Sequence, residues 1–253
     1  MKNLPRVNLT MYRKQAGYTL IEFMVAGVLG LILLLGVMQI YLGATQTNRL
    51  QAGVIEVQDS GRFALSFLEK DIQRAGWSNL DPGINLGTLD THIDFANSTN
   101  ASGYNSSDSL TIQYEADDEA GVNNNYNCGG DLIPPGDLII NEYRVDAGSL
   151  LCNDRQLLSN VETLQFVYGA EDTGQLTDGI VDIYLRADEI GGYEETVVTV
   201  RVALLLRSTN DVLDSNNTNA YQVFEFPFAA VNDKKLRRLF NKTILLPNRP
   251  KAF

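Results

Sequence analysis

The sequence predicts an α+β fold, in which one long N-terminal helix packs on a globular domain built mainly of antiparallel β-strands. Two observations lead to this prediction. No proline occurs between Tyr18 and Asp81, so a helix can run through most of that stretch without interruption. Beyond Gly76, apolar residues occur in short alternating runs separated by polar loops, a pattern typical of half-buried strands. A chain of 253 residues has room for one membrane helix and one sizeable domain.

A short basic leader opens the chain, and a long apolar run follows it. The leader, residues 1–17, contains no acidic residue, as expected of a segment kept on the cytoplasmic side of a membrane. Loss of its four cations would take the formal net charge of the chain from −11 to −15. So acidic a protein repels phosphate backbones, and we expect no binding to nucleic acid. The four cations are Lys2, Arg6, Arg13 and Lys14.

One carboxylate, that of Glu22, lies just inside the apolar run, and no further charge occurs before Arg49. An acid costs about 2.5–3.5 kcal/mol at the centre of a membrane helix and less near its end, so such a residue is more often functional than accidental. Three interpretations compete for this segment. A secretory signal peptide would end at a small-residue cleavage site, but no clear Ala-x-Ala site ends the run. An ordinary single-pass anchor fits the length of about 20 residues but leaves Glu22 unexplained.

The third interpretation is a resemblance. The run Gly-Tyr-Thr-Leu-Ile-Glu, from Gly17 to Glu22, resembles the processing site of type IV prepilins. The resemblance implies that a prepilin peptidase cuts between Gly17 and Tyr18 and that the new amine of Tyr18 is N-methylated. The family more often has phenylalanine where this chain has Tyr18, and we expect the peptidase to tolerate the change because it mainly reads Gly17. This interpretation accounts together for the leader, for Glu22 and for the unbroken apolar run.

Two roles for Glu22 follow from these interpretations. In a filament, N-terminal helices pack in a bundle, where an unpaired charge is strongly unfavourable. The prepilin resemblance implies that Glu22 pairs with the terminal amine of a neighbouring subunit and so sets the axial register. The alternative is an acid at the membrane surface that reaches out to water.

Helical periodicity continues beyond the apolar run. Apolar and small residues recur there at spacings of three and four, which predicts one stripe that packs on a domain. We therefore expect a membrane or filament-core half of the helix over residues 18–44, an amphipathic half over residues 45–76, a helix end at Gly76, and a β-rich domain over residues 77–253. The stripe consists of Leu50, Val54, Val57, Gly61, Ala64, Leu68, Ile72 and Ala75.

Several glycines lie in the apolar half of this helix. One explanation is that they permit a close approach between helices in lipid or in a filament core. The alternative is that membrane helices simply tolerate glycine. The residues concerned are Gly27, Gly30, Gly36 and Gly43.

Short runs in the rest of the chain predict strands, and the clearest is Val198–Leu206, which has one apolar face. A long polar loop is expected over residues 115–136, and a short hairpin over Arg144–Leu151. The other predicted strands are Ser109–Tyr114, Leu138–Val145, Leu164–Tyr168, Ile180–Leu185, Tyr221–Phe226 and Thr243–Leu246.

Two cysteines, Cys128 and Cys152, lie in the polar middle of the chain. A single pair beyond a membrane segment indicates a disulfide formed in an oxidising compartment. Closing a loop of this length would contribute about 3–4 kcal/mol of stability. A metal site with two cysteine ligands is the rival interpretation, but no Cys-x-x-Cys spacing and no neighbouring histidine supports it. We expect the disulfide to pin the long loop to the end of the hairpin.

Three stretches narrow the resemblance. Gly61–Trp77 looks like the corresponding helix of PilW-type minor pilins and of the related J-type pseudopilins, and Val161–Tyr168 fits the same family. The tail Lys234–Leu246, with its Arg-Arg-x-Phe…Thr…Leu pattern, is similar to the end of PilW-type proteins. The resemblance touches both ends and the middle of the chain, while the loops between match nothing known to us.

Sites for catalysis or metal binding find little support. His92 is the only histidine and has no paired nucleophile, so we expect a structural or surface role for it. No phosphate-binding loop, dinucleotide fingerprint or nucleophile elbow is present. Two acidic clusters could offer oxygens to calcium, but neither has EF-hand spacing; they are Asp117, Asp118, Glu119 and Asp131, and Asp211, Asp214, Asn216 and Asn217. A solvated or subunit-facing basic patch is expected from Lys234, Lys235, Arg237 and Arg238.

The sequence therefore predicts a structural subunit without cofactor or metal, not an enzyme. The resemblance implies a minor pilin that crosses the inner membrane once, with its C-terminal domain in the periplasm, and later lies in the pilus at the cell surface. Its implied partners are other minor pilins, the major pilin and the inner-membrane assembly platform, with a tip adhesin as a further candidate. Its implied task is to prime pilus assembly and to stay at the tip. Two alternatives stay open: a J-type pseudopilin of a type II secretion system, and a membrane-anchored periplasmic binding or enzymatic domain.

Overall fold

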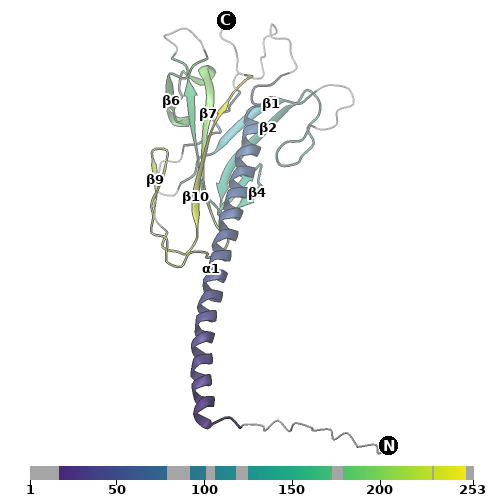
Figure 1. Cartoon of the computed structure of the whole chain (residues 1–253). Helices are drawn as coiled ribbons and strands as arrows, with labels where there is room; N and C mark the ends of the chain where they lie inside the picture. The colour runs from purple at the N-terminus through teal and green to yellow at the C-terminus, as the bar shows by residue number, and fades with distance from the viewer. Residues whose placement is uncertain are drawn as a thin grey trace, which may run out of the picture. The chain divides into compact units, whose positions relative to one another are not determined.

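The computed structural model describes residues 17–78, 92–100, 106–117, 125–172, 179–229 and 231–248. Within these residues, one long helix, α1 (Leu20–Ile72), precedes ten β-strands and two short 3₁₀ helices (Figure 1). Every pairing between the strands is antiparallel, so the α+β prediction is confirmed. The chain divides into two compact units, Met1–Asn48 and Arg49–Phe253, and the boundary falls within α1.

The first sheet has four strands in the order β1-β2-β3-β4. Ala147 and Gly148, at φ of 47° and 77°, form the two-residue turn between β2 and β3, as hairpin turns with both central residues at positive φ do. A similar turn at Asn153 and Asp154, with φ of 45° and 64°, leads into β4, which the sequence pattern did not predict. The strands are β1 (Leu110–Glu115), β2 (Leu138–Asp146), β3 (Ser149–Cys152) and β4 (Arg155–Ser159).

The second sheet has the order β10-β7-β5-β6. The clearest predicted strand, Val198–Leu206, lies at its centre as β7. The edge strand β6 is shorter than predicted, and β10 begins at Arg237 instead of Thr243, so the Arg-Arg-x-Phe pattern of the tail lies on a strand. The strands are β5 (Val161–Ala170), β6 (Ile183–Leu185), β7 (Val197–Arg207) and β10 (Arg237–Leu245), with the 3₁₀ helices η1 (Ala187–Glu189) and η2 (Glu194–Thr196) between β6 and β7.

A separate hairpin pairs β8 (Tyr221–Val223) with β9 (Phe226–Phe228). The prediction of a single strand over Tyr221–Phe226 is wrong, because the chain reverses at Phe224. Phe224 has φ of 52°, a conformation that favours glycine, so the usual sequence signal for this turn is missing. The guanidinium of Arg201 lies 5.3 Å from the centre of the Phe224 ring and 4.8 Å from that of Tyr184, and this cation–π contact holds the turn against the second sheet.

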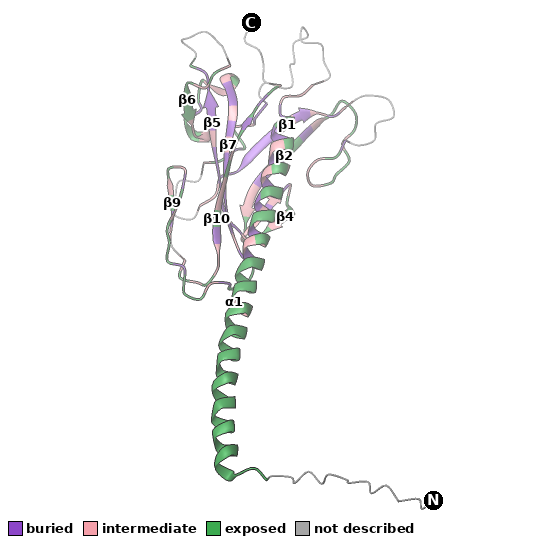
Figure 2. Cartoon of the chain, viewed as in Figure 1, coloured by how far each residue is buried: buried purple, intermediate pink, exposed green. Residues whose placement is uncertain are grey.

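The second half of α1 completes the hydrophobic core. Leu68 and Ile72 are fully buried in one cluster with residues of both sheets, such as Tyr143 of β2 and Leu204 of β7 (Figure 2). The buried stripe differs from the predicted one near its start, because Gly53 is buried whereas Leu50 is 38% exposed. The buried residues of α1 are Gly53, Val57, Gly61, Ala64, Leu68, Asp71 and Ile72.

The helix ends at Ile72, four residues before the predicted stop, and Gly76 closes the turn that follows. The N–H of Gly76 donates to the carbonyl of Gln113 in β1 at 2.9 Å. Gly76 has φ of 76°, and a Cβ at this position would lie 2.8 Å from the Cβ of His92, so both the conformation and the space require glycine. His92 is buried, which makes its role structural.

Candidate functional site

The segment from Gly17 to Glu22 forms the N-terminal end of α1. Gly17, Tyr18 and Thr19 precede the helix, and Tyr18 is 88% exposed. The rest of the leader, residues 1–16, lies outside the described residues. The peptide bond between Gly17 and Tyr18 is therefore part of an exposed, non-helical stretch, which is the kind of backbone that a peptidase can bind.

Thr19 caps this helix. Its Oγ1 accepts a hydrogen bond from the N–H of Glu22 at 3.3 Å, and its carbonyl accepts one from the N–H of Phe23 at 3.2 Å. Thr-x-x-Glu is the spacing of a capping box, and a negative charge in the first turn is favoured by the helix dipole. Glu22 thus helps to start the helix, a role that the sequence analysis missed although the spacing signals it.

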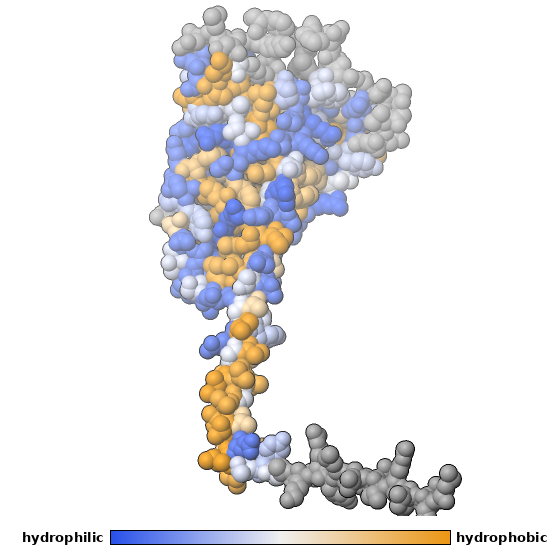
Figure 3. All heavy atoms as spheres, in the orientation of Figure 1, coloured by the Kyte–Doolittle hydropathy of each residue, from blue (hydrophilic) through white to orange (hydrophobic). Residues whose placement is uncertain are grey.

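The first half of α1 exposes apolar side chains on all sides. Every residue from Gly17 to Ala44 is exposed, and Figure 3 shows the apolar surface that results. By length and composition, α1 is the one helix among the described residues that could cross a membrane. A Cβ placed at any of its first glycines would meet no atom within 4 Å; they are Gly27, Gly30, Gly36 and Gly43. So large an apolar surface needs a cover of lipid or of other helices.

Two glycines in the second half of α1 instead touch the domain. A Cβ at Gly61 would lie 2.5 Å from the ring of Phe240 in β10, and one at Gly53 would lie 2.9 Å from Val212. Glycine therefore lets the helix backbone lie directly against β10 and against the loop that follows β7. Two polar contacts flank these positions: Glu56 accepts hydrogen bonds from Thr209, and Lys242 pairs with Glu69.

Asp71 is buried near the end of α1 and accepts three hydrogen bonds. The hydroxyl of Tyr114 donates to Oδ1 at 3.2 Å, the amide of Asn141 donates to Oδ2 at 2.7 Å, and the hydroxyl of Tyr143 also donates to Oδ2. The helix dipole disfavours an acid here, so these donors offset both the dipole and the loss of water. Burial, and then the charge of Asp71, raises the pKa of Tyr143 and keeps its hydroxyl protonated as a donor.

A disulfide joins Cys128 to Cys152, with a Cα–Cα distance of 5.8 Å. Cys152 is the last residue of β3 and is fully buried, so the bond holds the loop before β2 against the first sheet. Asn141 connects this loop to the Asp71 cluster, because its Oδ1 accepts a hydrogen bond from the N–H of Cys128 at 2.9 Å. The end of α1, the first sheet and the disulfide loop therefore form one linked structure.

The positions considered for calcium have other contacts. Asp131 exchanges three hydrogen bonds with Asn127, and the backbone of Asp117 exchanges two with the side chain of Asn125. Asp118 and Glu119 lie outside the described residues. In the second cluster, the amide of Asn217 donates to the hydroxyl of Tyr221 at 3.0 Å. Across the described residues, no three His, Cys, Asp or Glu side chains are placed to hold a metal ion.

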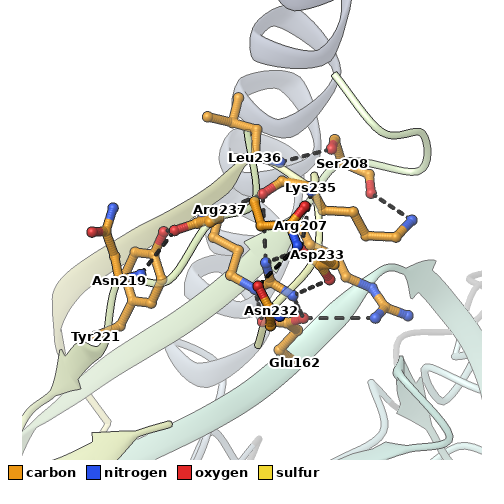
Figure 4. Close-up of polar contacts among 12 residues, drawn as sticks. Glu162, Arg207, Ser208, Asn219, Tyr221, Asn232, Asp233, Lys235, Leu236 and Arg237 are labelled. Atoms are coloured by element: carbon orange, nitrogen blue, oxygen red, sulfur yellow. Dashed lines mark hydrogen bonds and ion pairs between the residues drawn. The ribbon is translucent and has the colours of Figure 1, made fainter. Parts of the chain in front are cut away.

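The expectation of a solvated or subunit-facing basic patch in the tail is wrong for Arg237. Its side chain is only 1% exposed and lies between two carboxylates (Figure 4). Nε and Nη2 donate to Glu162 at 2.7 and 2.8 Å, and Nη1 and Nη2 donate to Asp233 at 2.6 and 2.7 Å. The hydrogen bonds to Asp233 and then to Glu162 raise the pKa of Arg237, and the same contact lowers the pKa of Asp233. The charge is buried because two carboxylates neutralise it, one from Asp233 four residues earlier and one from Glu162 in β5, 75 residues earlier.

This network positions the loop that packs on α1. The N–H of Leu236 donates to Oγ of Ser208 at 3.0 Å, and Nζ of Lys235 donates to the carbonyls of Ser208 and Thr209 (Figure 4). Lys235 therefore also differs from the expected solvated patch, whereas Arg238 is exposed as expected. Thr209 and Val212 of this loop contact α1. The Arg237 network therefore stabilises the contact between helix and domain indirectly, through the loop.

Two family models match this chain. Residues 122–248, just over half of the chain, match the family model PilW, described as type IV pilus-assembly protein W. Residues 12–38 match the prokaryotic N-terminal methylation motif. No curated protein matches the chain. Among solved structures, a type IV-like pilin from Thermus thermophilus is 16% identical, with a TM-score of 0.46, and the alignment covers 78% of this chain and 100% of that one.

Proposed function

Because this chain belongs to the PilW family of type IV pilus-assembly proteins, and is a pilus-related structural subunit and not an enzyme, we propose that it is a minor pilin that primes pilus assembly. The apolar helix with its methylation motif anchors the chain in a membrane. On this proposal it crosses the inner membrane once, with the β-rich domain in the periplasm. It then joins other minor pilins and the major pilin at the assembly platform and remains at the pilus tip, where a tip adhesin is a candidate neighbour.

The observation that carries the proposal is the uncovered first half of α1. Within the described part of the chain, every residue from Gly17 to Ala44 is exposed. Each Å² of apolar surface removed from water contributes about 25 cal/mol, so this surface strongly favours lipid or other apolar helices. Lipid covers it in the precursor, and the helices of neighbouring subunits cover it in the filament.

The N-terminus supplies the charge pair that such a bundle needs. Cleavage between Gly17 and Tyr18 would leave a positive amine just before the Thr19 cap and close to Glu22. Inside a helical bundle, neither charge is stable without a partner. We propose that Glu22 binds the methylated amine of a neighbouring subunit and so fixes the axial position of the two helices.

Mass spectrometry of the N-terminus tests the processing step directly. In cells with prepilin peptidase, we expect a chain that lacks residues 1–17 and begins at N-methylated Tyr18. Without the peptidase, we expect the intact precursor. A mature chain that begins at any other residue would contradict the proposal.

A substitution tests the assembly step. Glu22→Ala should leave membrane insertion and processing intact but strongly reduce piliation. Asp59→Ala is a suitable control, because Asp59 is an exposed acid of the same helix outside the apolar half. Normal piliation in Glu22→Ala would show that Glu22 is not needed for assembly and is only a surface acid that helps to cap the helix. Loss of protein secretion with intact pili would instead favour the J-type pseudopilin.

A further inference from the structure

Two adjoining hollows lie where α1 ends against the first sheet. Their volumes are about 320 and 510 Å³, and both are lined by Arg74, Tyr114 and Tyr126. We refer to the two together as the α1-end groove. We propose that this groove binds a neutral saccharide, a function that goes beyond filament assembly and does not depend on it.

Aromatic side chains are the first reason. Trp77, the one tryptophan of the chain, lines the groove with Tyr114 and Tyr126. Tyr126 is 50% exposed and belongs to neither hydrophobic cluster of the described residues, so packing does not explain it. A pyranose ring has a flat face of C–H bonds that is buried favourably on an aromatic ring, while its hydroxyls remain free for polar partners.

Polar side chains beside these rings are the second reason. The guanidinium of Arg74 lies 5.9 Å from the centre of the Tyr114 ring, and Gln73 and Asn127 line the larger hollow. The guanidinium of Arg74 and the amide of Gln73 present donors and an acceptor to sugar hydroxyls, whereas the amide of Asn127 is already paired with Asp131. A few such groups among aromatic residues in a concave surface are typical of a small-molecule site.

The balance of charge selects a neutral ligand. Among the described residues, two cations, Lys70 and Arg74, line the groove together with three acids, Asp71, Glu115 and Asp117. A phosphate or nucleotide would need an excess of positive charge that this lining lacks. A polyhydroxylated ligand without charge meets neither repulsion nor the cost of burying an ion.

Hydrogen bonds hold the backbone on both sides of Tyr126 in place. Its neighbour Asn125 is buried and donates from Nδ2 to the carbonyl of Asp117 at 2.6 Å, while its carbonyl accepts a hydrogen bond from Ile133. On the other side, Asn127 pairs with Asp131 and precedes the disulfide at Cys128. Less backbone entropy is then lost when a ligand binds, which favours affinity in a shallow site.

Glycan binding to the full-length chain tests this proposal, in a detergent without a sugar headgroup. An array of glycans identifies neutral oligosaccharides, and titration calorimetry should then give a Kd of about 1 mM or tighter for the best of them. Tyr126→Ala should weaken binding at least tenfold, whereas Tyr126→Phe should retain it. Tyr184→Ala is the matched control, since Tyr184 is 46% exposed and lies on the second sheet.

Three results would overturn the proposal. The first is that no neutral glycan binds at ligand concentrations of about 10 mM. The second is an equal loss of affinity in the Tyr126→Ala and Tyr184→Ala chains, with the near-ultraviolet circular dichroism of both unchanged. The third is a Tyr126-dependent affinity for a peptide or another pilus subunit and none for sugars, which would make the groove a protein-binding surface.

Discussion

The two halves of α1 share one continuous backbone but have opposite surroundings. The first half is apolar and exposed at every described residue up to Ala44, whereas the second half buries one stripe against two sheets. Their glycines show the contrast most directly: Gly30 has open space around it, and Gly61 has the ring of Phe240 in contact. The same residue type thus has two different surroundings in one helix. We expect substitutions in the second half to affect folding and, on the proposed function, those in the first half to affect assembly.

The two acids near the ends of α1 differ in the same way. Asp71 is buried and has three donors from its own chain. Glu22 is exposed in the first turn, and within the described part of the chain it forms no ion pair. The partners of Asp71 are thus intramolecular, whereas the proposed function gives Glu22 the processed amine of a neighbouring subunit as its partner.

The largest effect is expected from Arg237→Ala. Removing the guanidinium takes four hydrogen bonds from the carboxylates of Glu162 and Asp233. Among the described residues, Glu162 then keeps only the longer ion pair with Arg207, at 3.6 Å, and the free energy of unfolding should fall by about 3–5 kcal/mol. The loop that packs on Gly53 and Glu56 should loosen, and the second half of α1 would then pack less firmly on the domain. Denaturant unfolding of the full-length chain in detergent measures the loss.

The neighbouring residue provides the control for this prediction. Arg238 is exposed on the same strand, and Arg238→Ala should change stability by less than about 0.5 kcal/mol. Equal losses from both substitutions would show that the charge of the strand matters and not the buried network.

A smaller effect is expected from Gly61→Leu. The new side chain would overlap the ring of Phe240, and overpacking of this kind costs about 1–3 kcal/mol. Gly30→Leu is the matched change in the first half, and it should leave the unfolding of the domain unchanged. Denaturant unfolding of both chains compares them, and similar losses of stability would remove the distinction between the two halves.

Features set by local sequence were predictable. The helix follows from its three- and four-residue spacing and from the lack of proline between Tyr18 and Asp81. The strands that became β1, β2 and β7 alternate clearly and were predicted to within a residue or two at each end. Their positions follow from side-chain periodicity, which needs no knowledge of distant contacts.

Features set by distant contacts were not predictable. Arg237 is part of a basic run that would normally be solvated, and its partner Glu162 lies 75 residues earlier in the chain. The turn at Phe224 has no glycine or asparagine to signal it. Arg201, on another strand, holds the Phe224 ring by a cation–π contact that the local sequence does not reveal. Gly53 and the Asp71 cluster were missed for the same reason, since only the folded chain shows which residues face them.

Thr19→Ala should have a local effect of about 1 kcal/mol, the usual cost of losing a helix cap. The first turn of α1 should fray, because the N–H of Glu22 loses its acceptor. Faster hydrogen exchange at residues 20–23, with no change in the unfolding of the domain, would confirm this, and Thr19→Ser should restore protection. Unchanged exchange in Thr19→Ala would contradict a capping role.

The smallest effect concerns the acid stability of the Arg237 network. The hydrogen bond from Arg237 lowers the pKa of Asp233 in the folded chain, whereas an unfolded chain has an ordinary value of about 3.9. Between these two values the unfolded state binds more protons, so the stability contributed by Asp233 is complete above about pH 5 and is lost as the pH falls through the folded pKa. Because the side chain of Asp233 is 24% exposed, we expect this part to be less than about 1 kcal/mol.

Asp233→Asn isolates this contribution. The variant should be less stable than the wild type at about pH 7, but its stability should fall less steeply between about pH 5 and pH 2.5, because one linked proton is gone. Thermal unfolding of both full-length chains across that range measures the two slopes. If the slopes were identical, the stability of the loop behind the second half of α1 would not depend on the charge of Asp233. The packing of Val212 on Gly53 would then hold that loop without the ion pair.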